Sequence, residues 1–229
     1  QDITTVGFQP DWVWNKRRDG AASHVIYDSV RGTGNEIGSN NNAAEATGVS
    51  GVTAFLSNGY SLGNNGNIND SGETYASWNW LAGGSAVSNT EGTITSSVSA
   101  NPEAGVSIMA YTGNGSSSQT VGHGLGAVSS PSMLIVKNRD QNDNWIVRTN
   151  ATGEDKFLFL NDVSSGGTSS VALPTTDVIG LGTSGYDNTS GEDYVAYLFS
   201  NVDGFSKCGS YIGNGNANGT FIHTGFRPA

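Results

Sequence analysis

Short runs that alternate apolar and polar residues, each closed by Gly, Asn or Ser, recur along the whole chain. This two-residue period is typical of strands with one buried face, and few segments show the spacing of an amphipathic helix. The pattern therefore predicts an all-β fold with many turns. Strands are expected within residues 3–6, 11–14, 23–28, 52–55, 59–63, 73–80, 106–111, 120–125, 131–140, 144–148, 156–160, 179–182 and 190–199.

One stretch of this pattern occurs twice. Residues 10–19 and 131–140 both begin with Pro, continue with alternating large apolar residues and end in Lys-x-Arg-Asp. Residues 190–199 likewise echo residues 71–80, and the matched blocks keep one order at spacings of about 115 to 121 residues. A fixed spacing of this kind predicts a tandem duplication of a domain of roughly 100 residues.

A third copy begins near the end of the chain and stops early. Its Tyr211-Ile212-Gly213-Asn214-Gly215 replays residues 111–115, and residues 225–228 match residues 7–10. The first copy has no such Tyr-x-Gly-Asn-Gly strand at its front, so we expect the tail to supply one, within the chain or to another subunit. The predicted organisation is a first β-sandwich at 1–85, a Ser/Thr/Asn-rich linker or exposed strand at 86–105, a second β-sandwich at 106–205 and a partial third repeat at 206–229.

Composition removes several classes of function. The chain has 229 residues, a net charge of −10 and no basic cluster longer than residues 16–18, so nucleic acid is not expected as a partner. No apolar run approaches the ~18 residues that span a bilayer, and no signal peptide is visible. The single Cys208 excludes an intrachain disulfide and a Cys-rich metal site. Because the chain begins on Gln1, we expect a processed product or an excised piece.

Several motifs together resemble a known family. They are the Gly-Phe-Gln/Arg-Pro turns, the Asp-Trp-Val-Trp strand with its Lys-x-Arg corner, Glu-Thr-Tyr-x-x-Trp-Asn-Trp, Val-Gly-His-Gly-Leu-Gly and Tyr-x-Gly-Asn-Gly. The chain resembles an uncharacterised tandem β-sandwich repeat domain of virion and tail-fibre proteins of tailed phages, especially marine ones. The resemblance implies two tandem antiparallel β-sandwiches of jelly-roll or lectin-like type, located in a virion or outside the cell, but no activity. Asn15 departs from it, because an aliphatic residue is expected there.

Candidate catalytic and metal sites are weak. The chain has three histidines, His24, His123 and His223. His123 and His223 lie in or beside repeated turns, which favours a structural role over a general base or metal ligand. Loops rich in Asn and Asp at 65–70, 140–144 and 187–193 offer oxygen ligands for Ca²⁺, but none has the Asp-x-Asn-x-Asp-Gly pattern and all consist of ordinary turn residues. No carboxylate pair typical of a glycosidase is apparent. We therefore predict no enzyme activity and no cofactor other than this Ca²⁺ alternative.

Two binding roles remain. The first is self-assembly into a fibre or filament, with other virion proteins as further partners. The second is binding of a cell-surface glycan, held by loops 29–51 and 161–174. Residues 16, 18 and 19 and residues 137, 139 and 140 are expected to form a salt-bridged corner of each sandwich. Candidate glycan contacts are Tyr60, Tyr111, Tyr186 and Tyr211, and the candidate assembly strand contains Tyr211, Ile212, Phe221, Ile222 and Phe226.

Overall fold

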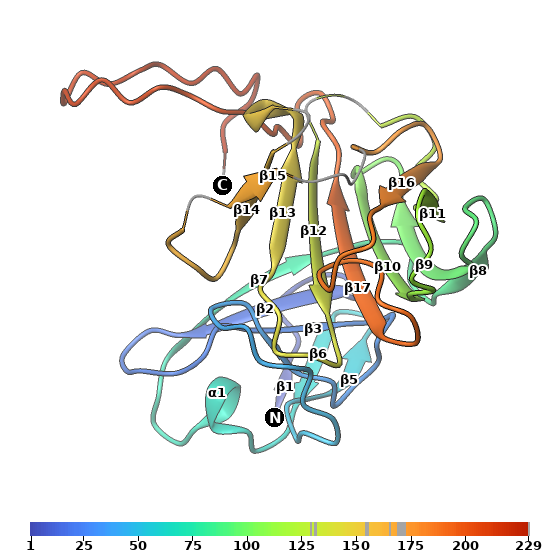
Figure 1. Ribbon diagram of the computed structural model, residues 1–229. Helices are drawn as coiled ribbons and strands as arrows, with labels where there is room; N and C mark the ends of the chain where they lie inside the picture. Colours follow the sequence, from blue (N-terminus) through green and yellow to red (C-terminus); the bar gives the residue numbers. More distant parts are fainter. Residues whose placement is uncertain (129, 131, 154–155, 165, 169–172, 229) are drawn as a thin grey trace.

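The computed structural model describes residues 1–128, 130, 132–153, 156–164, 166–168 and 173–228. These residues form four antiparallel sheets (Figure 1). The predicted all-β, antiparallel fold is confirmed, and the described helices are the single turns α1 (Gly66–Asn69) and η1 (Asn150–Thr152).

Two of the sheets come from the first third of the chain. The N-terminal outer sheet has the order β1 (Asp2–Ile3), β6 (Gly59–Leu62), β5 (Val52–Leu56). The N-terminal inner sheet has the order β4 (Ile37–Gly38), β3 (Val25–Asp28), β2 (Trp12–Arg17), β7 (Tyr75–Trp80).

The remaining two sheets come from residues 87–199. The eight-stranded sheet has the order β15 (Gly167–Thr168), β14 (Lys156–Phe159), β13 (Ile146–Thr149), β12 (Met133–Asn138), β17 (Asp193–Phe199), β10 (Val106–Thr112), β9 (Ser96–Asn101), β8 (Val87–Asn89). The two-stranded sheet pairs β11 (Gln119–Gly122) with β16 (Val178–Leu181).

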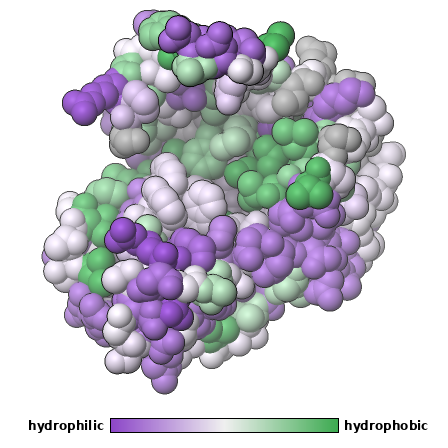
Figure 2. Space-filling view, turned by 90° about the vertical axis from the view of Figure 1, so that its left-hand side faces the viewer, coloured by the Kyte–Doolittle hydropathy of each residue, from purple (hydrophilic) through white to green (hydrophobic). Residues whose placement is uncertain are grey.

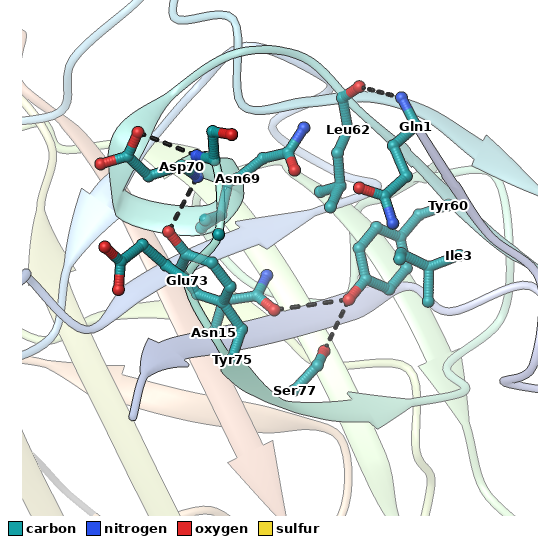
Figure 3. A pocket seen from close by; sticks show the side chains of 13 residues that line it. Gln1, Ile3, Asn15, Tyr60, Leu62, Asn69, Asp70, Glu73, Tyr75 and Ser77 are labelled. Carbon is teal, nitrogen blue, oxygen red and sulfur yellow. Dashed lines mark hydrogen bonds between the residues drawn. The ribbon is translucent and has the colours of Figure 1, made fainter. Parts of the chain in front are cut away.

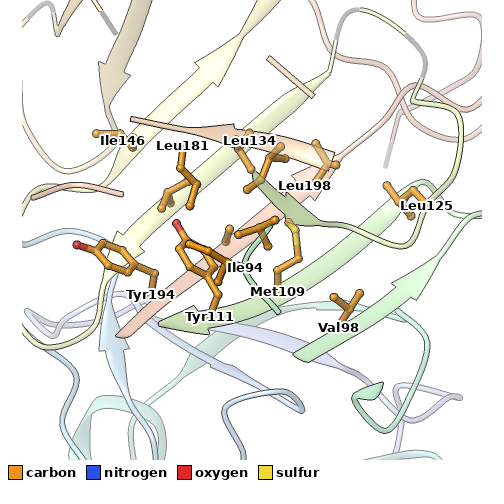
Figure 4. Close-up of a cluster of buried hydrophobic side chains, with 14 residues drawn as sticks. Ile94, Val98, Met109, Tyr111, Leu125, Leu134, Ile146, Leu181, Tyr194 and Leu198 are labelled. Atoms are coloured by element: carbon orange, nitrogen blue, oxygen red, sulfur yellow. The ribbon is translucent and has the colours of Figure 1, made fainter. Parts of the chain in front are cut away.

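Three apolar cores separate the sheets into four layers. Val13 and Tyr27 of the inner sheet pack on Val52 and Leu62 of the outer sheet. The opposite face of the inner sheet packs on the eight-stranded sheet, as alternation along a strand requires. A third core lies between the eight-stranded and two-stranded sheets (Figure 4).

The middle core joins the two halves of the molecule. Trp12 contacts Tyr197 and Phe199 of β17 with ring centroids 5.0 and 5.5 Å apart. The strands of the inner sheet run across those of the eight-stranded sheet (Figure 1). Where the two sheets diverge, an apolar cleft of about 330 Å³ opens between the halves (Figure 2).

The segment predicted as a linker or exposed strand contains β8 and β9. Both belong to the eight-stranded sheet, and Val98 of β9 is buried in the third core. Ser96 and Ser99 are buried because their hydroxyl groups are paired, Ser96 donating to the Gly122 carbonyl at 3.1 Å and Ser99 accepting from the Gly83 amide at 2.9 Å.

Candidate functional site

Strand β7 is an open edge. It pairs with β2 along Tyr75–Trp80, and within the described residues no strand pairs with its other side. The second half has the same strand order, because β14-β13-β12-β17 there corresponds to β4-β3-β2-β7 here. In the second half, however, β17 pairs with both β12 and β10. An unpaired edge of this kind is a template for another strand.

A groove lies beside the start of β7, between the two N-terminal sheets (Figure 3). Its volume is about 610 Å³. The residues that line it are Gln1, Ile3, Asn15, Tyr60, Leu62, Ile68, Asn69, Asp70, Ser71, Gly72, Glu73, Tyr75 and Ser77.

Hydrogen bonds fix the wall of this groove. The hydroxyl group of Tyr75 accepts from the Asp70 amide at 2.9 Å (Figure 3). The same hydroxyl group donates to the Gly66 carbonyl, also at 2.9 Å. Asn65 begins α1 by accepting from the Asn67 amide at 2.8 Å, as an N-cap residue does. Asn69 at the end of α1 donates its side-chain amide to the Gly63 carbonyl at 2.6 Å.

The second half repeats these contacts 119 residues further on. The hydroxyl group of Tyr194 accepts from the Thr189 amide and donates to the Gly185 carbonyl, again at 2.9 Å. The side-chain amide of Asn188 donates to the Gly182 carbonyl at 3.1 Å. The two halves therefore build the same structure, here called the cradle, from residues 63–75 in the first half and residues 182–194 in the second.

In the second half the cradle is filled by the end of β10 and the turn after it. Tyr111 is buried, stacks on Tyr194 with ring centroids 5.3 Å apart, and donates its hydroxyl group to the Asp187 carbonyl at 2.9 Å. The Asn114 amide donates to the side-chain oxygen of Asn188 at 2.9 Å. The Gly115 amide donates to the Asn188 carbonyl at 3.0 Å.

Asn15 adds a polar group to the first groove. It stands where the second half has Val136, and it is buried with 3% of its surface exposed. Its oxygen accepts from the Tyr60 hydroxyl group at 3.4 Å, but its side-chain nitrogen has no partner among the described residues. Buried donors are nearly always paired, so this one points to a missing acceptor.

The candidate assembly strand is exposed. Tyr211 and Ile212 have 70% and 87% of their surface in contact with solvent, Phe221 and Ile222 are also exposed, and Phe226 is half-buried. The tail projects from one end of the molecule, whereas α1 and the N-terminus lie at the other end (Figure 1).

The four tyrosines considered as glycan contacts have different surroundings. Tyr60 and Tyr111 are buried in cores, so their rings face protein rather than solvent. Tyr186 is half-buried against Phe157 and Phe159. Tyr211 presents its ring to solvent. Loop 161–174, expected to hold a glycan, includes residues 165 and 169–172, which are outside the described residues.

The Lys-x-Arg-Asp corners hold each half together through their aspartates. Asp19 accepts from the Thr74 amide at 2.7 Å, and Asp140 accepts from the Asp193 amide at 2.6 Å. In the first corner Arg17, rather than the expected Arg18, bonds to Asp19 at 2.9 Å and also pairs with Glu73. The Arg17 hydrogen bond holds the pKa of Asp19 far below its ordinary value.

Loop 29–51 docks on the second half, a feature that sequence reasoning missed. Arg31 is buried between Asp28 and Glu45, at 2.6 Å from each carboxylate. Glu45 also accepts from Arg139 at 2.6 Å, and the Tyr197 hydroxyl group donates to Asp28 at 2.7 Å. Glu45 of the loop and Asp28 at the end of β3 therefore hold the two halves together.

The three histidines lie in different parts of the fold. His123 is buried and accepts from the Leu125 amide at 3.2 Å, and burial lowers the pKa of its ring. The backbone amide of His24 donates to the side-chain oxygen of Asn40 in loop 29–51 at 2.8 Å, and His223 is in the tail. Within the described ranges, no group of three His, Cys, Asp or Glu side chains is arranged to hold a metal ion, and no helix is long and apolar enough to cross a membrane.

A family model described as a domain of unknown function (DUF7483) matches residues 1–229. The chain belongs to this DUF7483 family. No curated protein and no solved structure matches it.

Proposed function

We propose that this DUF7483 protein is a non-enzymatic structural protein that assembles head to tail with copies of itself. The observation that carries this proposal is the pair of complementary features in one chain. An unfilled cradle beside an open sheet edge lies at one end, and an exposed segment with the sequence that fills the equivalent cradle lies at the other. Strand addition to a free sheet edge is a common mode of association.

The tail is held away from the chain's own cradle. The Cys208 amide donates to Asn201 at 2.6 Å, and the Ser210 hydroxyl group donates to the Ala151 carbonyl at 3.0 Å. Tyr211 follows Cys208 by three residues, a reach of roughly 10 Å in extended chain. Since the cradle lies at the opposite end of the molecule, the tail would reach the cradle of another copy instead (Figure 1).

An association of this type is heterologous, because each copy uses two different surfaces. Heterologous contacts that do not close a ring extend into a filament. A fibre or virion component outside the cell is the setting that fits this behaviour. It agrees with the phage tail-fibre family that the repeat motifs resemble, in which other virion proteins would anchor the ends.

The proposal is tested by the mass of the intact chain in solution. We expect sedimentation or light scattering to show masses above that of the monomer, increasing with protein concentration. A chain that ends at Ser210 keeps the contacts of Cys208 and Ser210 and loses the projecting segment, so it should stay monomeric with an unchanged unfolding temperature. An intact chain that is monomeric at every concentration would contradict the proposal.

A further inference from the structure

We propose a specific binding site and register for this association. The groove beside β7 binds residues Tyr211–Gly215 of a second copy, with Tyr211 stacked on Tyr75 and the Gly-Asn-Gly turn over Asn69. This inference rests on the proposed head-to-tail assembly and assigns the residues that form the contact.

The second half supplies the register. There, β10 pairs with β17 so that Tyr111 lies opposite Tyr194, and Ala110 lies opposite Val195. Residues of the tail correspond to residues of β10 at an interval of 100. Residues of the first cradle correspond to residues of the second at an interval of 119. Transferring the pairing places Tyr211 opposite Tyr75 and Ser210 opposite Ala76.

The backbone groups of the groove that this register requires are in place, and no described residue bonds to them. In the second half, the Gly113 amide donates to the Glu192 carbonyl and its carbonyl accepts from the Gly191 amide, both at 2.9 Å. The corresponding groups of the groove are the Glu73 carbonyl and the Gly72 amide. Neither of them, nor the side-chain oxygen of Asn69, has a hydrogen bond within the part of the chain that is described.

The free tail already has the bound turn conformation. Gly215 has a φ of +67°, against +71° for Gly115 in the filled cradle. The Asn216 amide donates to the side-chain oxygen of Asn214 at 3.0 Å, and Ser116 makes the same bond to Asn114 at 3.0 Å. Because little ordering is needed, association loses less conformational entropy.

A tyrosine in the groove would also supply an acceptor for the unpaired donor there. The Tyr211 hydroxyl group would donate to the Ile68 carbonyl, as Tyr111 does to the Asp187 carbonyl. Its oxygen can still accept a hydrogen bond. The side-chain nitrogen of Asn15, a buried groove-lining donor, lacks an acceptor. This pairing explains why a polar residue is tolerated where the second half has Val136.

Glycine 213 provides the first test. A Cβ on Gly113 would lie 2.3 Å from the Thr189 carbonyl oxygen, whereas a Cβ on Gly213 has no atom within 4 Å in the free tail. Gly213→Ala should therefore leave the monomer intact and weaken association roughly tenfold or more, through a clash with Asp70 of the acceptor. Equal association of Gly213→Ala and wild type would overturn the register.

The matched control is Gly209→Ala. Gly209 also has open space around it, and its counterpart in the filled cradle is Met109, so a side chain fits there. We expect this variant to associate like wild type. A similar loss in both glycine variants would indicate an effect of tail flexibility and would also overturn the assigned contact.

Disulfide trapping is the second test. Opposed residues of antiparallel strands have Cα atoms about 4.5–5.5 Å apart, within the range that a disulfide spans. Full-length Ala76→Cys and Ser210→Cys chains, mixed under oxidation, should form a covalent dimer. A Ser77→Cys chain mixed with Ser210→Cys is shifted by one residue, and Ala76→Cys mixed with wild type reports on Cys208. Trapping that does not exceed these controls would overturn the register.

The two proposals can fail separately. A monomeric intact chain removes both. Assembly that persists in Gly213→Ala and shows no selective trapping retains head-to-tail association and removes the Tyr211–Gly215 contact.

Discussion

Lys137 is an ionisable residue placed where water does not reach. It is fully buried at the second Lys-x-Arg-Asp corner, where its ammonium group donates to the carbonyls of Asn138 and Gln141. Burial lowers its pKa to about 8 from the ordinary 10.5. Its sequence motif predicted a corner residue but gave no sign that the amine is buried, because burial depends on the strands packed around it.

This shift gives a pH dependence of known sign. Between about pH 8 and 10 the unfolded chain keeps the Lys137 proton and the folded chain loses it, so this residue makes the free energy of unfolding rise with pH. The slope is at most about 1.4 kcal/mol per pH unit. Burial also raises the pKa of the Cys208 thiol, which makes stability fall with pH in the same range, so the test is a difference between chains. Chemical denaturation at about pH 7.5, 8.5 and 9.5 should give wild type a more positive slope of unfolding free energy against pH than Lys137→Met.

Buried tyrosines limit this test to that pH window. Burial raises the pKa of Tyr111 and Tyr197, so the unfolded chain releases their protons first and stability decreases above about pH 10. Lys156→Met, at an exposed position, is the control and should keep the wild-type slope. An unchanged slope in Lys137→Met would mean that Lys137 titrates normally.

At the scale of the element, the end of β10 shows how tightly the filled cradle is packed. Gly113→Ala places a Cβ against the Thr189 carbonyl, so we expect a loss of about 1–3 kcal/mol in the free energy of unfolding. Gly213→Ala, the same change in the free tail, should cost the monomer nothing. Urea denaturation of both variants at low protein concentration measures the difference, and equal effects would contradict the correspondence between the two segments.

Strand periodicity predicted most elements because their alternation survives in the sequence. The repeated motifs by themselves predict β2, β12, β7 and β17. The sequence of β9 fits either a linker or an exposed strand, since serines dominate it and the burial of Ser96 and Ser99 depends on hydroxyl partners elsewhere in the fold. Strand propensity does not account for such hydrogen bonds between distant parts of the fold.

The sequence alone predicted only part of the candidate site. The sequence indicated that the tail repeats residues 111–115, which identified the donor. It did not indicate the groove, because Asn69, Glu73 and Tyr75 look like ordinary turn and strand residues until their bonds are compared with those of Asn188, Glu192 and Tyr194. The sequence of loop 29–51 predicts an exposed loop that could hold a glycan, because its Gly- and Asn-rich composition gives no sign that Arg31 is buried.

At the scale of the whole molecule, the two halves share a core and an ionic network. Glu45 has only 4% of its side chain exposed and bonds to Arg31 in one half and Arg139 in the other. We therefore expect one cooperative unfolding transition by calorimetry. Glu45→Ala removes one of the two carboxylates that pair with the buried Arg31. The free energy of unfolding should therefore decrease by about 3–5 kcal/mol.

The exposed Glu103 supplies the control, because Glu103→Ala removes a carboxylate of equal charge from the surface. That variant should unfold within about 0.5 kcal/mol of wild type. Two separate transitions in the wild-type chain would mean that the middle core does not couple the halves.

The opposite placement of cradle and tail gives any assembled polymer a direction. One terminus would always present a vacant cradle and the other a free tail, so the two termini would grow and bind other proteins differently. A protein that occupies the vacant cradle would cap one terminus without affecting the other. Length and attachment would then be controlled independently, by partners that mimic one half of the same contact.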